Sequence, residues 1–144
     1  MRALIICYGN PLRGDDGLGW RVAERLRVAV QDPSVEILSL HQLTPELMDP
    51  ISHADRAIFI DACDGLVPGE IQERVVEPQT MGVAFTHHST PAALLAGARS
   101  LYGRAPMATL ITVTGADFSL SDELSPVVSA RMDDVVSAAL RIVG

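Results

Sequence analysis

Short, uninterrupted apolar segments alternate with amphipathic segments along this chain, and this alternation constrains the fold more than any other feature. Continuous apolar runs of strand length are typical of strands buried on both faces, whereas apolar residues spaced three or four apart indicate helices. Strands that alternate with helices predict an α/β fold of three layers with a mostly parallel sheet. We expect strands over residues 2–9, 35–40, 56–62, 70–76 and 108–114, of which the charged segment 70–76 suits an exposed edge.

The expected helices begin at recognisable start signals. A hydroxyl residue followed by proline is typical of a helix N-terminus, because the hydroxyl caps the helix and proline fits its first turn. We expect helices over residues 17–30, from Thr44, over 90–102, and from Ser125 to the C-terminus. The last of these has an apolar face at helical spacing, formed by Val128, Met132, Val135, Val136, Ala139, Leu140 and Val143.

Length and composition fit one domain over residues 1–144, with a core that is largely aliphatic. Hydrophobic residues make up 48% of the chain but aromatic residues only 4%. No apolar run approaches the roughly 20 residues that cross a bilayer, and the N-terminus lacks the pattern of a signal peptide. Cys7 and Cys63 lie in apolar strand-like runs and are interpreted as reduced core thiols, so we expect a cytoplasmic protein.

The charged residues exclude several classes of function. All 11 basic residues are arginine, and the 18 acidic residues give a formal net charge of −7. A chain without lysine has no Schiff-base lysine, phosphate-loop lysine or lysine general base. An acidic chain without a basic stripe is not expected to bind nucleic acid or an anionic membrane. Nothing in the sequence requires more than a monomer.

The segment after the first expected strand, residues 9–19, reads GNPLRGDDGLG and places two aspartates before a helix. It lacks both the G-x-G-x-x-G dinucleotide fingerprint and the lysine of a phosphate loop. Asp15 and Asp16 would repel a pyrophosphate, so this loop suits a cation or a hydrogen-bond donor. Aspartate is favoured at helix N-caps, and capping therefore accounts for one of the two and leaves the other available for function.

Further metal-ligand side chains follow other expected strands. Asp61 ends a buried run, where a carboxylate is costly unless it is paired or coordinating, although an Asx turn with Asp64-Gly65 is equally compatible. His87 and His88 precede a capped helix, and neutral imidazole is the commonest metal ligand. Ligands of open α/β sheets bind beyond the carboxyl ends of the strands. We therefore expect an acidic residue of the first loop, Asp61 and one histidine to form a divalent-metal site with an open face.

Other chemistries fit the sequence poorly. It has no G-x-S-x-G elbow, no H-E-x-x-H helix and no C-x-x-C pair. Cys63 is a conceivable nucleophile near His88, but a free cysteine beside a strand end is usually a packing residue.

With these residues in view, the chain resembles the [NiFe]-hydrogenase maturation endopeptidases along nearly its whole length. Four segments carry the resemblance in the family's order: the opening motif at residues 9–19, the second at 61–65 and 68–69, the third from His88 through Tyr102-Gly103, and the start of the C-terminal helix at 124–126. The resemblance implies a three-layer α/β/α fold with a mostly parallel, twisted five-stranded sheet. It also implies removal of the C-terminal extension from the [NiFe]-hydrogenase large-subunit precursor after nickel insertion.

The resemblance further implies which residues act. The family's three metal-binding residues correspond to Asp16, Asp61 and His88, which we therefore expect to be both catalytic and metal-binding. The chain has His87 beside His88, and the spacing to Tyr102-Gly103 favours His88. Two carboxylates and one histidine without a visible supporting motif hold a divalent ion loosely, which suits nickel that belongs to the precursor rather than a tightly held intrinsic ion.

Two other functions use the same residues. A small-molecule α/β metallohydrolase predicts a deep, closed pocket, whereas the peptidase predicts a shallow, open cleft for a folded partner. A non-catalytic nickel- or precursor-binding assembly factor would bind the precursor without shortening it.

Overall fold

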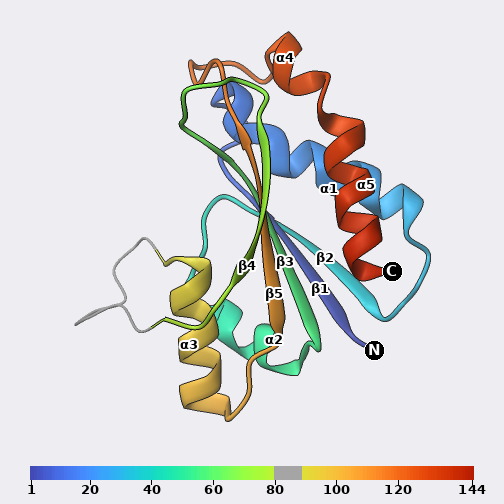
Figure 1. Cartoon of the computed structure of the whole chain (residues 1–144), viewed down its shortest axis with the longest axis vertical. Helices are drawn as coiled ribbons and strands as arrows, with labels where there is room; N and C mark the ends of the chain where they lie inside the picture. The colour runs from blue at the N-terminus through green and yellow to red at the C-terminus, as the bar shows by residue number, and fades with distance from the viewer. Residues whose placement is uncertain (80–88) are drawn as a thin grey trace.

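The computed structural model describes residues 1–79 and 89–144, which form a five-stranded sheet with helices on both faces (Figure 1). The order across the sheet is β2-β1-β3-β5-β4. All neighbouring pairs are parallel except β4 and β5, which are antiparallel. The strands are β1 (Ala3–Tyr8), β2 (Val35–Leu40), β3 (Arg56–Cys63), β4 (Ile71–Val76) and β5 (Met107–Thr114). The predicted α/β fold with a mostly parallel sheet is confirmed, and the charged segment is an edge strand as expected.

The helices form the two outer layers (Figure 1). One face of the sheet is covered by α1 (Leu18–Ala29), α4 (Pro126–Ser129) and α5 (Met132–Val143), and the other by α2 (Met48–His53) and α3 (Pro91–Tyr102). Two short 3-10 turns, η1 (Gly14–Gly17) and η2 (Pro45–Leu47), lead into α1 and α2. None of the helices in the described parts of the chain is long and apolar enough to span a bilayer.

The sheet interior explains why the strand segments are continuously apolar. In β1, Ile5 and Cys7 pack against α1 and α5, whereas Leu4 and Ile6 pack against α2 and α3. Successive side chains of a strand point to opposite faces, so a strand covered on both sides needs apolar residues at every position. Each fully buried large aliphatic side chain stabilises the fold by about 1.5–3 kcal/mol.

The C-terminal segment forms two helices, so the prediction of one continuous helix is wrong. After α4 the amide of Arg131 donates to the carbonyl of Val128, three residues back, and this tighter turn separates α4 from α5. No glycine or proline marks the break, and the apolar spacing continues through it. The sequence therefore carries no signal that the helix is interrupted. Leu140, expected on the apolar face, is exposed, and Ala138 is buried on that face instead.

The two threonine–proline start signals differ in the structure. The hydroxyl of Thr90 accepts a hydrogen bond from the amide of Ala93 at 3.1 Å and caps α3, as expected. Thr44 precedes η2, but its side chain makes no capping bond within the described part of the chain.

Candidate functional site

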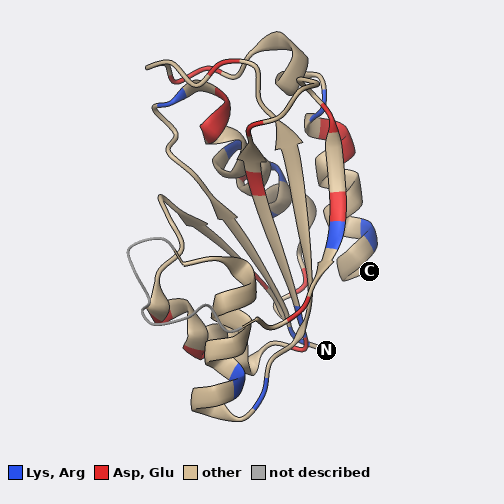
Figure 2. Ribbon diagram, turned by 60° about the vertical axis from the view of Figure 1, so that its left-hand side comes forward, with Lys and Arg blue, Asp and Glu red and all other residues tan. Residues whose placement is uncertain are grey.

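The predicted acidic residues lie at the edge of the sheet where the parallel strands end. Asp16 belongs to η1, directly after β1, and Asp61 lies near the end of the neighbouring strand β3. Acidic segments gather at this end of the molecule, in and beyond the carboxyl ends of the strands (Figure 2). The topology therefore brings together two carboxylates that are 45 positions apart in the sequence.

The turn after β1 fixes the position of Asp16. Gly9 has a φ of +140°, and a Cβ at this position would lie 2.1 Å from the carbonyl oxygen of Asp16, so only glycine fits there. The amide of Asn10 donates to Asp16 Oδ2 at 2.7 Å. The indole Nε1 of Trp20 donates to the carbonyl of Gly9 at 2.9 Å and anchors the turn to α1. The glycine-rich loop thus serves to hold a carboxylate and not a phosphate.

Asp61 is the most perturbed acid of the site. Burial, and to a lesser extent the nearby negative charge of Asp16, raise the pKa of Asp61 to about 7. Hydrogen bonds from the Ala62 amide and the Tyr8 hydroxyl act in the opposite direction but do not outweigh these effects. Two carboxylates that repel each other in a partly buried position are stabilised by a shared cation. The pair is therefore suited to a positively charged ligand.

Tyr8 is a site residue that the sequence analysis did not single out. Its position at the end of β1 places it beside Asp61 on β3, and burial together with the Asp61 charge raises the pKa of Tyr8. The hydroxyl therefore remains protonated and donates to Asp61. The signal available in the sequence was its place as the last residue of a buried strand, one residue before the loop.

Asp15 has a purely structural role, although it adjoins Asp16. Its side chain is fully buried and accepts four hydrogen bonds, from the amides of Ala116 at 2.7 Å and Asp117 at 3.0 Å, and from the amide and hydroxyl of Ser125 at 2.7 and 2.8 Å. Burial alone would raise the pKa of Asp15, but these hydrogen bonds lower it overall. The capping interpretation is wrong for both aspartates, because Asp15 binds the loop after β5 and Asp16 binds Asn10.

Asp16 opens onto solvent through a pocket of about 380 Å³. The pocket is open and not an enclosed cavity, and it is lined by Arg13, Asp16, Ala62, Cys63, Asp64 and Phe118. Cys63 is half-buried there, with its Sγ 3.8 Å from the hydroxyl of Thr114, so the expectation that it is a core thiol is wrong. Cys7 is a core thiol as expected: it is fully buried, and burial raises its pKa to about 12.

The two candidate histidines, His87 and His88, lie outside the described residues. Among residues 1–79 and 89–144, no group of three His, Cys, Asp or Glu side chains could hold a metal ion. The described site therefore consists of the Asp16–Asp61 pair, and the histidine ligand remains a prediction from the sequence.

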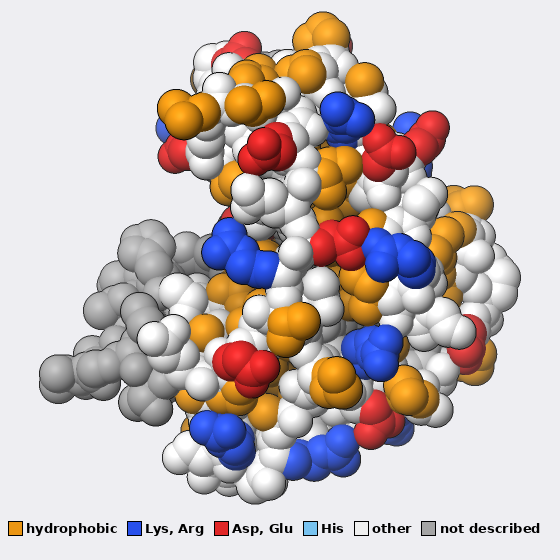
Figure 3. Space-filling model, in the orientation of Figure 1, with side chains coloured by type: hydrophobic (Ala, Val, Ile, Leu, Met, Phe, Trp, Pro, Cys, Tyr) orange, Lys and Arg blue, Asp and Glu red, His pale blue; other side chains and the backbone are white. Residues whose placement is uncertain are grey.

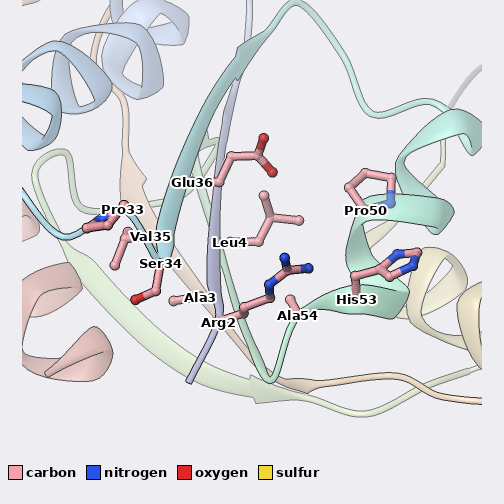
Figure 4. Close-up of a pocket in the computed structure, with 10 residues that line it drawn as sticks. All are labelled: Arg2, Ala3, Leu4, Pro33, Ser34, Val35, Glu36, Pro50, His53 and Ala54. Carbon is pink, nitrogen blue, oxygen red and sulfur yellow. The ribbon is translucent and has the colours of Figure 1, made fainter.

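A second hollow, of about 460 Å³, lies at the opposite edge of the sheet, where β1 and β2 begin (Figure 4). Arg2, Leu4 and Ala54 lie along it, and Glu36 is the one acidic residue among those that line it. His53 stands at its border, but its Nδ1 lies 2.8 Å from the carbonyl oxygen of Asp49 on its own helix. This hollow lacks the paired carboxylates of the other edge.

Fold and site together define an α/β protein with a cation-seeking carboxylate pair at the edge of the sheet where related folds bind nucleotides. The hydrogenase maturating endopeptidase HybD from Escherichia coli shares the fold with a TM-score of 0.81 and 26% identity, over all of this chain and 94% of that one. A [NiFe] hydrogenase maturation protease, HycI, from Thermococcus kodakarensis matches with a TM-score of 0.76 and 28% identity, over 98% of this chain and 91% of that one.

Sequence comparison points the same way. The hydrogenase 3 maturation protease of Escherichia coli K12 is 31% identical over 104 residues, which is 63% of this chain and 60% of the relative, so the match spans less than two thirds of that relative's length. A putative hydrogenase maturation protease of Methanocaldococcus jannaschii is 27% identical over 97% of this chain and 92% of that protein. No family model matches the chain. The chain is similar to hydrogenase maturation proteases in sequence and over its whole fold, which confirms the resemblance found in the sequence.

Proposed function

We propose that this protein is an endopeptidase that removes the C-terminal extension of a [NiFe]-hydrogenase large-subunit precursor once nickel has been inserted. The observation that carries the proposal is the Asp16–Asp61 pair, in which burial and mutual repulsion raise the pKa of Asp61 to about 7. A bound cation relieves the repulsion between the two carboxylates of such a pair and so stabilises it. Similarity to hydrogenase maturation proteases in sequence and fold supports the identity of the substrate.

In this proposal Asp16, Asp61 and His88 engage the nickel that the precursor already carries. Carboxylate oxygens and imidazole nitrogen are donors that divalent nickel accepts, so the residue types fit the ion. Asp16 is oriented by the amide of Asn10, and Asp61 by the amide of Ala62 and the hydroxyl of Tyr8. The three residues recognise the loaded precursor and position its scissile bond for hydrolysis. The nickel is part of the substrate and leaves with the product.

The open pocket at Asp16 favours a folded protein as substrate. A small-molecule hydrolase surrounds most of its ligand's surface in a closed pocket, whereas a peptidase acting on a folded partner needs an accessible face. We assign the reaction to the cytoplasm, where Cys7 and Cys63, which form no disulfide, stay reduced.

The test is mass spectrometry of the nickel-loaded large-subunit precursor before and after incubation with the purified protein. We expect loss of a short C-terminal peptide with the wild type and no shortening with Asp16→Asn, Asp61→Asn or His88→Ala. Asp49→Asn and His53→Ala are matched controls, because both residues are exposed on α2 near the opposite edge of the sheet. These controls should cleave normally.

Two outcomes would contradict parts of the proposal. An intact precursor after incubation with the wild type would rule out the peptidase and leave the assembly factor. Equal cleavage of nickel-free and nickel-loaded precursor would show that the three residues do not recognise nickel.

A further inference from the structure

Exposed apolar side chains are concentrated beside the carboxylate pair. Three segments meet at this edge: residues 10–17 after β1, residues 61–70, which include the last residues of β3, and residues 115–125 after β5. We call them the site segments. Five large apolar side chains at or next to these segments are exposed, and they form what we call the apolar rim: Leu12, Leu66, Val67, Leu120 and Val127. Leu66 is fully exposed, and Leu120 is 79% exposed. Hydrophobic side chains gather over this end of the molecule in the space-filling view (Figure 3).

The backbone beneath the rim is tightly held, so these side chains are not loose loop tips. The amide of Ser121 donates to the carbonyl of Leu12 at 2.9 Å, and the amide of Gly14 donates to the carbonyl of Ser121 at 2.8 Å. The amide of Gly115 donates to the carbonyl of Cys63 at 2.9 Å, which joins the third segment to the second. Because their backbone is already ordered, the rim residues lose little conformational entropy when a partner covers them.

The rim also adjoins the pocket of Asp16 directly. Arg13, Asp64 and Phe118 line that pocket, and each stands one or two residues from a rim leucine. A partner that reaches the carboxylate pair through the open pocket therefore contacts the rim. A single exposed leucine needs no explanation, but several exposed apolar side chains around a binding pocket are typical of an interaction surface.

The charge of the site segments indicates the chemistry of that partner. They carry one of the chain's 11 arginines but eight of its 18 acidic residues, namely Asp15, Asp16, Asp61, Asp64, Glu70, Asp117, Asp122 and Glu123. A surface of this charge repels a second copy of itself and attracts a basic one. The partner must therefore present apolar residues flanked by lysine or arginine.

We infer that the apolar rim is the docking surface for the large-subunit precursor, and that it recognises an apolar patch of the folded precursor bordered by basic side chains. The inference rests on the proposed function for the identity of the partner. According to this inference, the rim supplies most of the affinity for the precursor, and the carboxylate pair binds only a precursor that contains nickel. The two parts of the surface should then be separable by mutation.

The experiment compares Leu66→Ser and Leu120→Ser with Val28→Ser and Met107→Ser, whose side chains are 79% and 70% exposed elsewhere on the molecule. The probes are the nickel-loaded large-subunit precursors encoded in the source genome. We expect each rim variant to raise the Kd and the KM for the cleaved precursor by about tenfold with kcat unchanged, and each control to change neither. Thermal unfolding should be the same for all four variants, because the replaced side chains are exposed.

Binding and cleavage are measured separately, so that failure of the rim differs from failure of the proposed function. If both rim variants cleave the precursor with unchanged Kd and KM, the docking role of the rim is overturned and the proposed peptidase function stands. If the wild type binds the precursor but does not cleave it, and the rim variants lose this binding, the docking role of the rim is supported and the peptidase function is overturned. A wild type that neither binds nor cleaves any of these precursors would overturn both. Light scattering that shows a wild-type dimer dissociated by Leu66→Ser would assign the rim to a second copy of this chain and would also overturn the inference.

Discussion

At the scale of single residues, Asp61 reduces the stability of the fold in order to serve the site. Its pKa of about 7 lies above the ordinary value for aspartate, so the folded state holds the proton more tightly than the unfolded state. The resulting loss of stability is absent below the unfolded pKa, near 4, and is complete once the pH exceeds the folded pKa. Residues that destabilise a fold in this way are typical of functional sites.

Asp61→Asn should therefore stabilise the protein at pH 8 and have little effect near pH 4. We expect the free energy of unfolding to rise by about 2 kcal/mol at pH 8, which is discounted from the full pKa shift because solvent partly screens the site. Urea denaturation at both pH values measures this difference, with Asp49→Asn as the exposed control. A variant that is less stable than the wild type at pH 8 would contradict the assignment of Asp61.

We expect the opposite effect on stability for Asp15, although it is the neighbour of Asp16 in the sequence. Because hydrogen bonds lower its pKa, its contribution to stability is present above the ordinary pKa of aspartate and is lost as the pH falls through the folded value. Asp15→Asn should lower the free energy of unfolding by about 2–3 kcal/mol at pH 7, since a neutral amide accepts these hydrogen bonds less well. The difference from the wild type should shrink as the pH falls below the ordinary pKa of aspartate, whereas Asp122→Asn should leave the free energy of unfolding unchanged. An unchanged unfolding curve for Asp15→Asn would contradict the structural role.

The sequence could not have separated the roles of these two aspartates. The partners of Asp15 lie about a hundred positions away, at Ala116, Asp117 and Ser125, and no local pattern reports such contacts. The Asp16–Asp61 pairing was accessible, because parallel strands end at a common edge and each aspartate follows a recognisable apolar run. The sequence predicted where the carboxylates meet, while the four hydrogen bonds that immobilise Asp15 required the folded chain.

At the scale of elements, the strands were easier to predict than the helix ends. A strand buried on both faces, such as β1 or β3, needs an apolar residue at nearly every position, and this pattern is hard to mistake. The break between α4 and α5 and the missing cap at Thr44 depend on backbone hydrogen bonds that leave the apolar spacing unchanged. Helix ends are therefore where the sequence-based predictions failed.

Thr44 and Thr90, which both precede a proline at a helix start, allow a matched test of the cap of α3. Thr90→Ala removes the capping bond to the amide of Ala93 and should lower the free energy of unfolding by about 1 kcal/mol, whereas Thr44→Ala removes no such bond and should cost much less. Because α3 begins three residues after His88, Thr90→Ala should also slow precursor cleavage, and Thr44→Ala should not. Equal effects of the two variants on chemical denaturation would show that the cap does not stabilise α3.

At the scale of the whole molecule, the acidic charge is unevenly distributed, and this asymmetry predicts how the protein meets its partner. The site segments hold eight acidic residues and one arginine, so long-range attraction should bring a basic precursor surface to the apolar rim before close contact is made. Attraction of this kind is screened by salt and acts on the association rate more than on dissociation. We expect the association rate constant for the nickel-loaded precursor to fall about tenfold between roughly 0.05 M and 0.5 M salt, with the dissociation rate nearly constant.

Glu123→Gln should weaken the salt dependence, and Glu46→Gln, a control on η2, should leave it unchanged. An association rate that is insensitive to salt would mean that the acidic residues beside the rim do not steer the precursor, and that their charge acts only locally, at the Asp16–Asp61 pair.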